Sequence, residues 1–189
     1  MAIATRQDAY IGGEWIPGDG EEIEVRSPAT GELLGTVATS SPAQVDAAVQ
    51  AAADAFPAWR KVSLLERVEL CRAAFAICME RADEIAEMIT REVGKTIRES
   101  REEMVEYTAD HFRRASEDVL RYAGKVLPST QERTNDKRIV VVQEPIGVVA
   151  AVSPWNFPVD IAGIPIVYGL AIGCTAVWKP SEQAPLCAN

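Results

Sequence analysis

The chain has 189 residues and is poor in positive charge and in histidine. It has 19 Lys and Arg residues against 28 Asp and Glu, a single His, and a formal net charge of −9. This balance excludes ordinary nucleic-acid binding, because contacts to phosphates need a basic face. An excess of acidic residues instead favours a soluble protein.

Cysteine is also scarce, and its spacing does not suit a metal site. The four cysteines form no C-x-x-C pair and have no His near them, so we expect no zinc. Free thiols packed in a core suit a reducing compartment, and we expect a cytoplasmic protein. These residues are Cys71, Cys78, Cys174 and Cys187.

A long uninterrupted hydrophobic run is missing too. The N-terminus lacks a basic region followed by an apolar stretch, so we expect no signal peptide. The apolar run from Ile161 to Val177 is broken by Gly and Pro, and it is shorter than the roughly 20 residues of a membrane span. It predicts a buried helix followed by a strand, and we expect no membrane contact.

Residues 1–40 carry the signals of short strands. Gly12-Gly13 separates two short runs, 9–11 and 14–16, which predicts a hairpin with a two-residue turn. Further strands are expected at 22–25, where polar and apolar residues alternate, and at 33–37.

Three helices are expected next. Ser41-Pro-Ala-Gln44 and Ser63-Leu-Leu-Glu66 are capping-box patterns that begin the first two. Apolar residues then recur every three or four positions as far as Ile89, with a break allowed near Asp83, and this places Cys71 and Cys78 on the buried face.

The third helix should run from near Thr96 to Gly124. Its inner side is predicted to hold Ile97, Met104, Thr108, Phe112, Ala115, Val119 and Tyr122. Its outer side is predicted to be a solvated face with Glu99, Arg101, Glu102, Glu103, Glu106, Arg113, Arg114 and Asp118. His111 lies beside the inner stripe, and we interpret it as structural.

The last third of the chain has a different residue pattern. Residues 125–130 and 137–143 are expected to form two strands joined by a polar loop. After Pro145 the pattern predicts a strand at 147–152, a helix at 159–172, a strand at 175–178 and a new helix from Pro185. A strand, a helix and a second strand in this order predict the opening β-α-β unit of a parallel sheet.

Asn156 is the main candidate for chemistry. Pro154 ends the apolar strand and Pro158 is placed to open the next helix, so Asn156 is held between them. Ligands of open α/β sheets bind outside the carboxyl ends of strands, where a fixed amide can donate hydrogen bonds to an oxyanion. The alternative is that Asn156 satisfies only the backbone groups of its own turn.

Two motifs carry a family resemblance. Ser153-Pro-Trp-Asn-Phe-Pro158, followed by Trp178-Lys-Pro-Ser-Glu182, resembles the NAD(P)-dependent aldehyde dehydrogenase superfamily. The resemblance implies an α/β fold, in which helices pack on a small sheet beside the start of a parallel Rossmann-like sheet. Similar segments extend over nearly the whole chain: Tyr10-Ile-Gly-Gly-Glu-Trp15, Ser27-Pro-Ala-Thr-Gly31, Ala55-Phe-Pro-Ala-Trp59, Glu92-Val-Gly-Lys95 and Glu144-Pro-Ile-Gly-Val148.

The resemblance also implies roles for individual residues. Members of the family oxidise an aldehyde to a carboxylic acid through a thiohemiacetal on a Cys, and Asn156 would donate to its oxyanion. The cofactor is expected to be NAD, with NADP as the alternative. The expected cofactor-binding residues are Val152, Ser153, Pro154 and Trp155, which would line its channel, and Lys179, Ser181 and Glu182 at the adenine-side ribose.

The resemblance divides the chain into three parts. Residues 1–124 would be the N-terminal part of the cofactor-binding domain, 125–143 a hairpin that pairs with a neighbouring subunit in a homo-oligomer, and 144–189 the start of the parallel sheet. The glycine-rich cofactor loop, the nucleophilic Cys and the general-base Glu of the family would follow Asn189, with the catalytic domain. We therefore expect an N-terminal fragment that is inactive alone.

Two other functions remain open from the sequence. A truncated, non-catalytic relative could act as an assembly or binding module through the 125–143 hairpin. A reductive enzyme that works with an acyl-CoA would need different residues downstream. Cys174 follows a helix and precedes a strand, at the opposite end of the sheet from Asn156, so we do not expect it to be catalytic.

Overall fold

The computed structural model describes residues 6–188 and begins with two small sheets. Strand β1 (Arg6–Gln7) pairs in parallel with β5 (Leu33–Ala38), which pairs antiparallel with β4 (Glu22–Arg26). Strands β2 (Ala9–Ile11) and β3 (Glu14–Ile16) form the expected hairpin. Its turn residues Gly12 and Gly13 have φ values of 63° and 92°, the left-handed region that a tight hairpin turn requires. Strand β1 was not predicted.

Three helices follow, with the expected starts. Helix α1 (Pro42–Trp59) is capped by Ser41, whose Oγ accepts the N–H of Gln44 at 3.3 Å. Helix α2 (Leu64–Glu80) is capped in the same way by Ser63. The allowed break comes at Arg81, after which α3 (Ala82–Val93) runs to Gly94, whose φ of 82° ends the helix.

The next helix is continuous but not uniform. Helix α4 (Ile97–Glu102) starts with a complete capping box at Thr96 and passes through a π-helical segment, η1 (Glu103–Thr108), into α5 (Ala109–Arg121). Met104, Thr108, Ala115 and Val119 are buried as predicted.

Three residues of this helix contradict the predicted faces. Ile97 and Tyr122, expected on the inner side, are 49% and 60% exposed because they stand at the helix ends, beyond the packed neighbours. Glu103, expected on the solvated side, is completely buried. It begins the π segment, and its carboxylate is satisfied there by Lys95 and by the backbone N–H groups of Val159 and Asp160.

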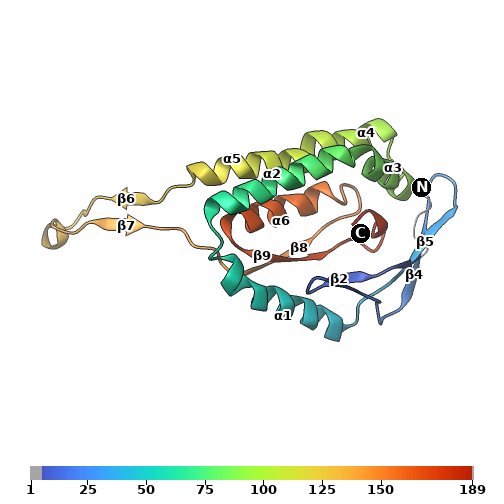
Figure 1. Cartoon of the computed structure of the whole chain (residues 1–189), viewed down its shortest axis with the longest axis horizontal. Helices are drawn as coiled ribbons and strands as arrows, with labels where there is room; N and C mark the ends of the chain where they lie inside the picture. The colour runs from blue at the N-terminus through green and yellow to red at the C-terminus, as the bar shows by residue number, and fades with distance from the viewer. Residues whose placement is uncertain (1–5, 189) are drawn as a thin grey trace.

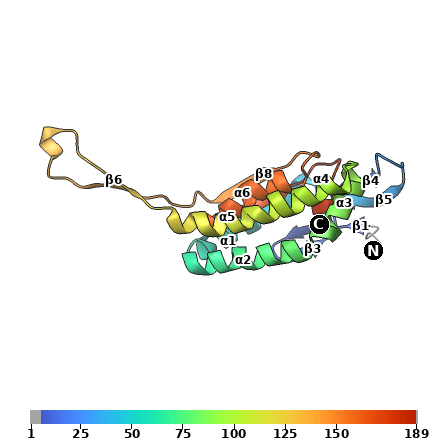
Figure 2. The same ribbon diagram turned by 90° about the horizontal axis from the view of Figure 1, so that it is seen from above.

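Strands β6 (Lys125–Leu127) and β7 (Ile139–Val141) form an arm that projects far from the rest of the molecule (Figures 1 and 2). They pair antiparallel with Val126 opposite Val140. The paired strands are shorter than predicted, and the connecting loop contains a short 3₁₀ turn, η2 (Glu132–Thr134).

The predicted β-α-β unit is confirmed. Strand β8 (Val148–Val152) pairs in parallel with β9 (Thr175–Lys179), and α6 (Asp160–Ile172) connects them. A short 3₁₀ turn, η3 (Leu186–Ala188), follows where a helix was expected. In Figure 1, α6 and α1 lie on opposite sides of the strand pair, and α2 and α5 pack outside α6.

The core joins these helices to the strand pair. Val68, Cys71, Ala115, Val119, Val167 and Ala171 form one cluster between α2, α5 and α6. The buried guanidinium of Arg67 donates from Nε to the carbonyl of Ala171 at 2.9 Å, near the C-terminus of α6. Cys71 is buried as predicted, whereas Cys78 is only half-buried. Within residues 6–188, no helix is both long and apolar enough to span a membrane.

Candidate functional site

The two sequence motifs meet at the carboxyl ends of the paired strands β8 and β9. Because the strands are parallel and Val152 lies opposite Lys179, the chain leaves both strands at the same end of the pair. The N–H of Ser153 donates to the carbonyl of Lys179 at 3.3 Å, and the indole N–H of Trp178 donates to Ser153 Oγ at 2.9 Å. Open α/β sheets bind their ligands just outside these carboxyl ends.

Residues 179–183, the end of β9 and the turn after it, are called the β9 loop and present an exposed pair of opposite charges. Lys179 Nζ lies 3.0 Å from Glu182 Oε2, and both side chains are about two-thirds exposed. The pKa of Glu182 is lowered, first by a hydrogen bond from its own backbone N–H and then by Lys179. Ser181 is buried, and its Oγ accepts the N–H of Gln183 at 3.2 Å, so its side chain orders the turn that follows the strand.

Residues 152–157, the end of β8 and the turn that carries Asn156, are called the β8 loop and include both buried and exposed residues. Ser153 is buried under Trp178, whereas Val152 and Trp155 are 70% and 52% exposed. Two large apolar side chains at a sheet edge are available to contact a ligand or further protein. Pro154, half-buried between them, fixes the direction in which the chain leaves the strand.

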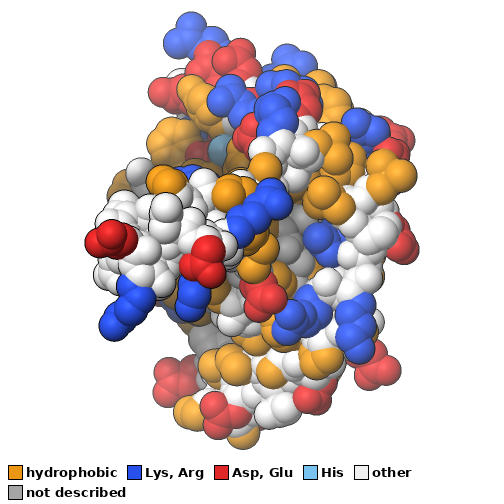
Figure 3. All heavy atoms as spheres, turned by 90° about the vertical axis from the view of Figure 1, so that its left-hand side faces the viewer, with side chains coloured by type: hydrophobic (Ala, Val, Ile, Leu, Met, Phe, Trp, Pro, Cys, Tyr) orange, Lys and Arg blue, Asp and Glu red, His pale blue; other side chains and the backbone are white. Residues whose placement is uncertain are grey.

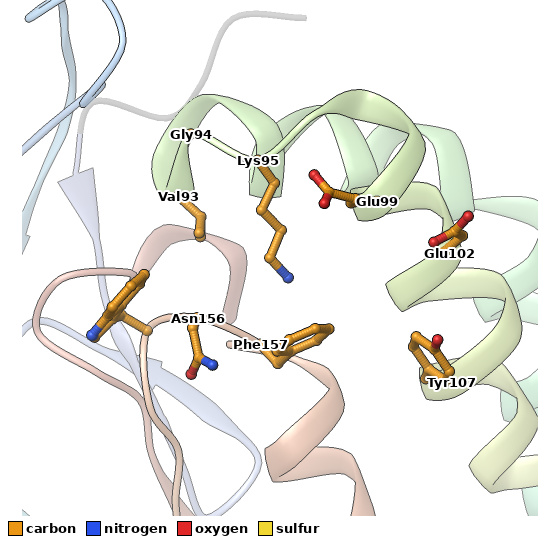
Figure 4. Close-up of a pocket in the computed structure, with 9 residues that line it drawn as sticks. Val93, Gly94, Lys95, Glu99, Glu102, Tyr107, Asn156 and Phe157 are labelled. Carbon is orange, nitrogen blue, oxygen red and sulfur yellow. The ribbon is translucent and has the colours of Figure 1, made fainter.

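Asn156 lies at a surface hollow of about 410 Å³ between this loop and the α3–α4 corner (Figure 4). Lys95, Tyr107 and Phe157 are among the side chains that line the hollow. The Asn156 side chain is exposed, and within residues 6–188 it makes no hydrogen bond. The contacts that the turn alternative requires are therefore absent from this part of the chain.

A buried carboxylate holds the segment after Asn156. Glu103 Oε1 accepts the backbone N–H groups of Val159 and Asp160, both at 3.2 Å, at the start of α6. Its other oxygen forms an ion pair with Lys95. The Lys95 ammonium lies 3.6 Å from the centre of the Phe157 ring. Sequence reasoning missed this cluster because α-helical periodicity placed Glu103 on the solvated face.

A second buried carboxylate holds the segment that follows the β9 loop. Glu92, in α3, accepts the backbone N–H groups of Leu186 and Cys187 at 2.6 and 2.9 Å. Burial raises the pKa of Glu92, and these hydrogen bonds oppose the shift. The sequence marks Glu92 only as part of the Glu92-Val-Gly-Lys95 segment and predicts no role for it.

His111 has a partner that the sequence did not reveal. Its Nε2 lies 2.8 Å from Asp160 Oδ1, with both side chains largely buried. Asp160 is in the first turn of α6, so this contact ties α5 to the same helix start that Glu103 caps. The structure agrees with a structural role for His111.

The four described cysteines are buried or half-buried free thiols. Burial raises the pKa of Cys71, Cys78 and Cys187. Cys174 is buried at the amino end of β9, the opposite end of the strand pair from the candidate site. The described cysteines therefore have the character of packing residues.

Comparison with known proteins gives consistent results. The model of the "Aldehyde dehydrogenase family" matches residues 15–189. Glutarate-semialdehyde dehydrogenase of Pseudomonas putida is 41% identical over 97% of this chain and 38% of its own length. Succinate-semialdehyde dehydrogenase [NADP(+)] of Escherichia coli is 40% identical over 97% of this chain and 37% of its own length.

Solved structures show the same likeness. NADP-dependent glyceraldehyde-3-phosphate dehydrogenase from Bacillus halodurans, complexed with NADP, superposes with a TM-score of 0.90 at 35% identity. The match covers 96% of this chain and 39% of that one. The chain thus spans somewhat more than a third of the length of the relatives that it matches.

Proposed function

The chain belongs to the aldehyde dehydrogenase family, and we propose that it supplies the oxyanion donor and part of the cofactor site of an enzyme that oxidises an aldehyde to a carboxylic acid with NAD or NADP. One observation carries the proposal. The loop with Asn156 follows β8, and the loop with Glu182 follows β9, so both begin at the carboxyl ends of adjacent parallel strands. The Ser153–Lys179 hydrogen bond joins the two loops. A dinucleotide bound across the carboxyl ends of these strands could place its adenine-side ribose at the Lys179–Glu182 loop and its nicotinamide toward Asn156.

Asn156 has the chemistry that the oxyanion role needs. A neutral amide donates hydrogen bonds at every working pH, because it does not titrate. The amide is exposed beside the hollow and has no partner within residues 6–188, so it can donate to a negatively charged oxygen. We assign the nucleophile and the general base to no residue of this chain.

The residues of the β9 loop fit a dinucleotide. The Glu182 carboxylate can accept hydrogen bonds from ribose hydroxyls, and the Lys179 ammonium can donate to them. Val152, Ser153, Pro154 and Trp155 would form the adjoining wall, and Ser181 would order the loop. The bound cofactor would accept the hydride, while these residues only bind and orient it.

The 125–143 arm is proposed as the contact with another subunit in a homo-oligomer. Val126 and Val140 are 58% and 56% exposed, and Ile146 at the base of the arm is 87% exposed. Figure 3 views the molecule from this end and shows hydrophobic side chains among charged ones. Exposed strand edges with apolar side chains are normally covered by another segment or another chain.

The arm can be tested separately from the active site. Val126→Asp together with Val140→Asp in the full-length protein should lower the subunit number seen by light scattering, because charge is placed on the paired strands. Lys137→Asp in the neighbouring loop is the charge control. An unchanged mass would remove the arm from the interface.

The enzymatic proposal is tested on the full-length protein with NAD, NADP and a panel of aldehydes. We expect reduced cofactor and carboxylic acid to form together in equal amounts. A parallel reaction with acyl-CoA and reduced cofactor tests the reductive alternative. If neither reaction proceeds while the protein assembles normally, the chain belongs to a non-catalytic assembly module, and the proposed function is wrong.

A further inference from the structure

The hydrogen bonds of Glu103 reach across the fold. This side chain is completely buried in the π segment, 56 residues away from the backbone N–H of Val159 that it binds. A buried carboxylate is unfavourable unless charges and donors satisfy it. Here two backbone N–H groups and the Lys95 ammonium do so. Glu103 thereby holds the start of α6, which follows Asn156 closely in the chain.

Lys95 contacts Phe157, the residue directly after Asn156. Its side chain is only 13% exposed, and its ammonium lies over the Phe157 ring at 3.6 Å. Cation–π attraction strengthens when the cation is removed from water. Phe157, directly after Asn156, is therefore held by Lys95 (Figure 4), while the start of α6 is held by Glu103.

We propose that Lys95 and Glu103 are a positioning pair, which sets the direction of the Asn156 amide. The inference rests on the proposed oxyanion role of Asn156. Within residues 6–188 the Asn156 side chain has no hydrogen bond of its own, so its place depends on the backbone that carries it. An oxyanion donor is effective only if it is already oriented before charge develops.

The alternative is that the pair stabilises the fold in a general way. The two roles differ in one measurable respect. A pair that acts through Asn156 loses its effect on turnover when Asn156 is removed, whereas a general stabiliser keeps its effect in either background.

The variants are chosen to remove charge with little change in shape. Glu103→Gln keeps an oxygen for the two N–H groups and removes the ion pair. Lys95→Met keeps the aliphatic stem against Phe157, but it leaves Glu103 buried and unpaired. The double variant Lys95→Met/Glu103→Gln leaves no buried charge and serves if Lys95→Met alone does not fold. Glu84→Gln, which breaks the exposed pair with Arg81, is the matched control.

In the full-length enzyme, Glu103→Gln and the double variant should lower kcat by about tenfold to a hundredfold, the effect of a misplaced group near the chemistry. KM for the cofactor should stay within about twofold of the parent, and the Asn156→Ala background should reduce the further loss to less than about twofold. An equal loss in both backgrounds, or full kcat in the double variant, would overturn the inference.

Backbone amide exchange provides a readout that needs no turnover. We expect faster exchange over residues 153–163 in Lys95→Met/Glu103→Gln than in the parent, and no change in Glu84→Gln. Unchanged exchange over this segment would refute the positioning role. A parent that oxidises no aldehyde would refute the proposed function instead, and the exchange result would then decide alone whether the pair positions the loop.

Discussion

At the scale of single residues, Asn156 gives the most direct prediction. Asn156→Ala removes one donor to the oxyanion, and such a loss lowers turnover by roughly a hundredfold to a thousandfold. We expect kcat of the full-length enzyme to fall by this amount, with nearly unchanged affinity for NAD because the β9 loop is not altered. Steady-state kinetics and a direct binding titration test both parts. A kcat within a few-fold of the parent would make Asn156 a structural residue.

Glu182 should influence the choice of cofactor. Its exposed carboxylate, beside Lys179, would accept hydrogen bonds from ribose hydroxyls and repel the phosphate that NADP carries in place of one of them. Solvent and Lys179 weaken this repulsion, so we expect a preference for NAD of about tenfold in kcat/KM.

The substitution Glu182→Gln keeps the shape and removes the charge. The ratio of kcat/KM for NAD to that for NADP should then move toward NADP in the full-length protein. Glu144→Gln, an exposed carboxylate outside the site, is a suitable control. If the ratio stays at the parent value, Glu182 does not contact the ribose.

Glu92 gives a prediction about pH and stability. Burial raises the pKa of its carboxyl above 4.5, so folding favours the protonated form. The stabilising contribution is therefore complete below pH 4.5 and is lost as the pH rises through the folded-state pKa. Replacement by Gln, which cannot ionise, removes this dependence.

Thermal unfolding of the full-length protein can measure the effect. The melting temperature of the parent relative to Glu92→Gln should fall as the pH rises from below 4.5 toward neutrality. Glu87→Gln, on an exposed position of the same helix, is the matched control. A constant difference between parent and Glu92→Gln over this range would contradict the raised pKa.

At the scale of elements, the sequence was informative wherever local rules decide the structure. Ser41 and Ser63 cap the helices that they were expected to cap, and Gly12-Gly13 makes the expected turn. The β-α-β unit also followed from pattern alone, because apolar runs separated by Gly and Pro leave few other arrangements.

The π segment shows where local rules fail. Glu103 follows three other charged residues among the preceding four positions, so α-helical spacing placed it in solvent. The carboxylate is nevertheless buried, and two N–H groups from the start of α6 and the Lys95 ammonium satisfy it. These partners are distant in sequence, and helical periodicity contains no information about them. Glu92 and the His111–Asp160 contact were missed for the same reason.

At the scale of the whole molecule, the candidate site consists of loops that other elements hold in place. The Asn156 loop depends on Glu103, and the segment after the β9 loop depends on Glu92, which lies in a different helix. The motif residues could be found from the sequence, because they are contiguous. Their supports could not, because each joins segments more than fifty residues apart.

The exposed apolar surface leads to a prediction about the 189-residue chain produced alone. Within residues 6–188, β8 and β9 pair only with each other, so each strand has an open edge. Val142, Ile146 and Val152 are 69%, 87% and 70% exposed. Strands of a parallel sheet are normally covered on both faces, and open edges promote association between chains.

We therefore expect this polypeptide to self-associate, and sedimentation velocity should show species larger than 20.5 kDa at micromolar concentration. Val142→Lys together with Ile146→Lys should reduce the association, because charge replaces apolar surface at the base of the arm. Lys137→Arg, which changes no charge, is the control. A monodisperse parent chain that melts cooperatively as a monomer would show that the β8–β9 edges and the surrounding apolar residues tolerate water without a partner.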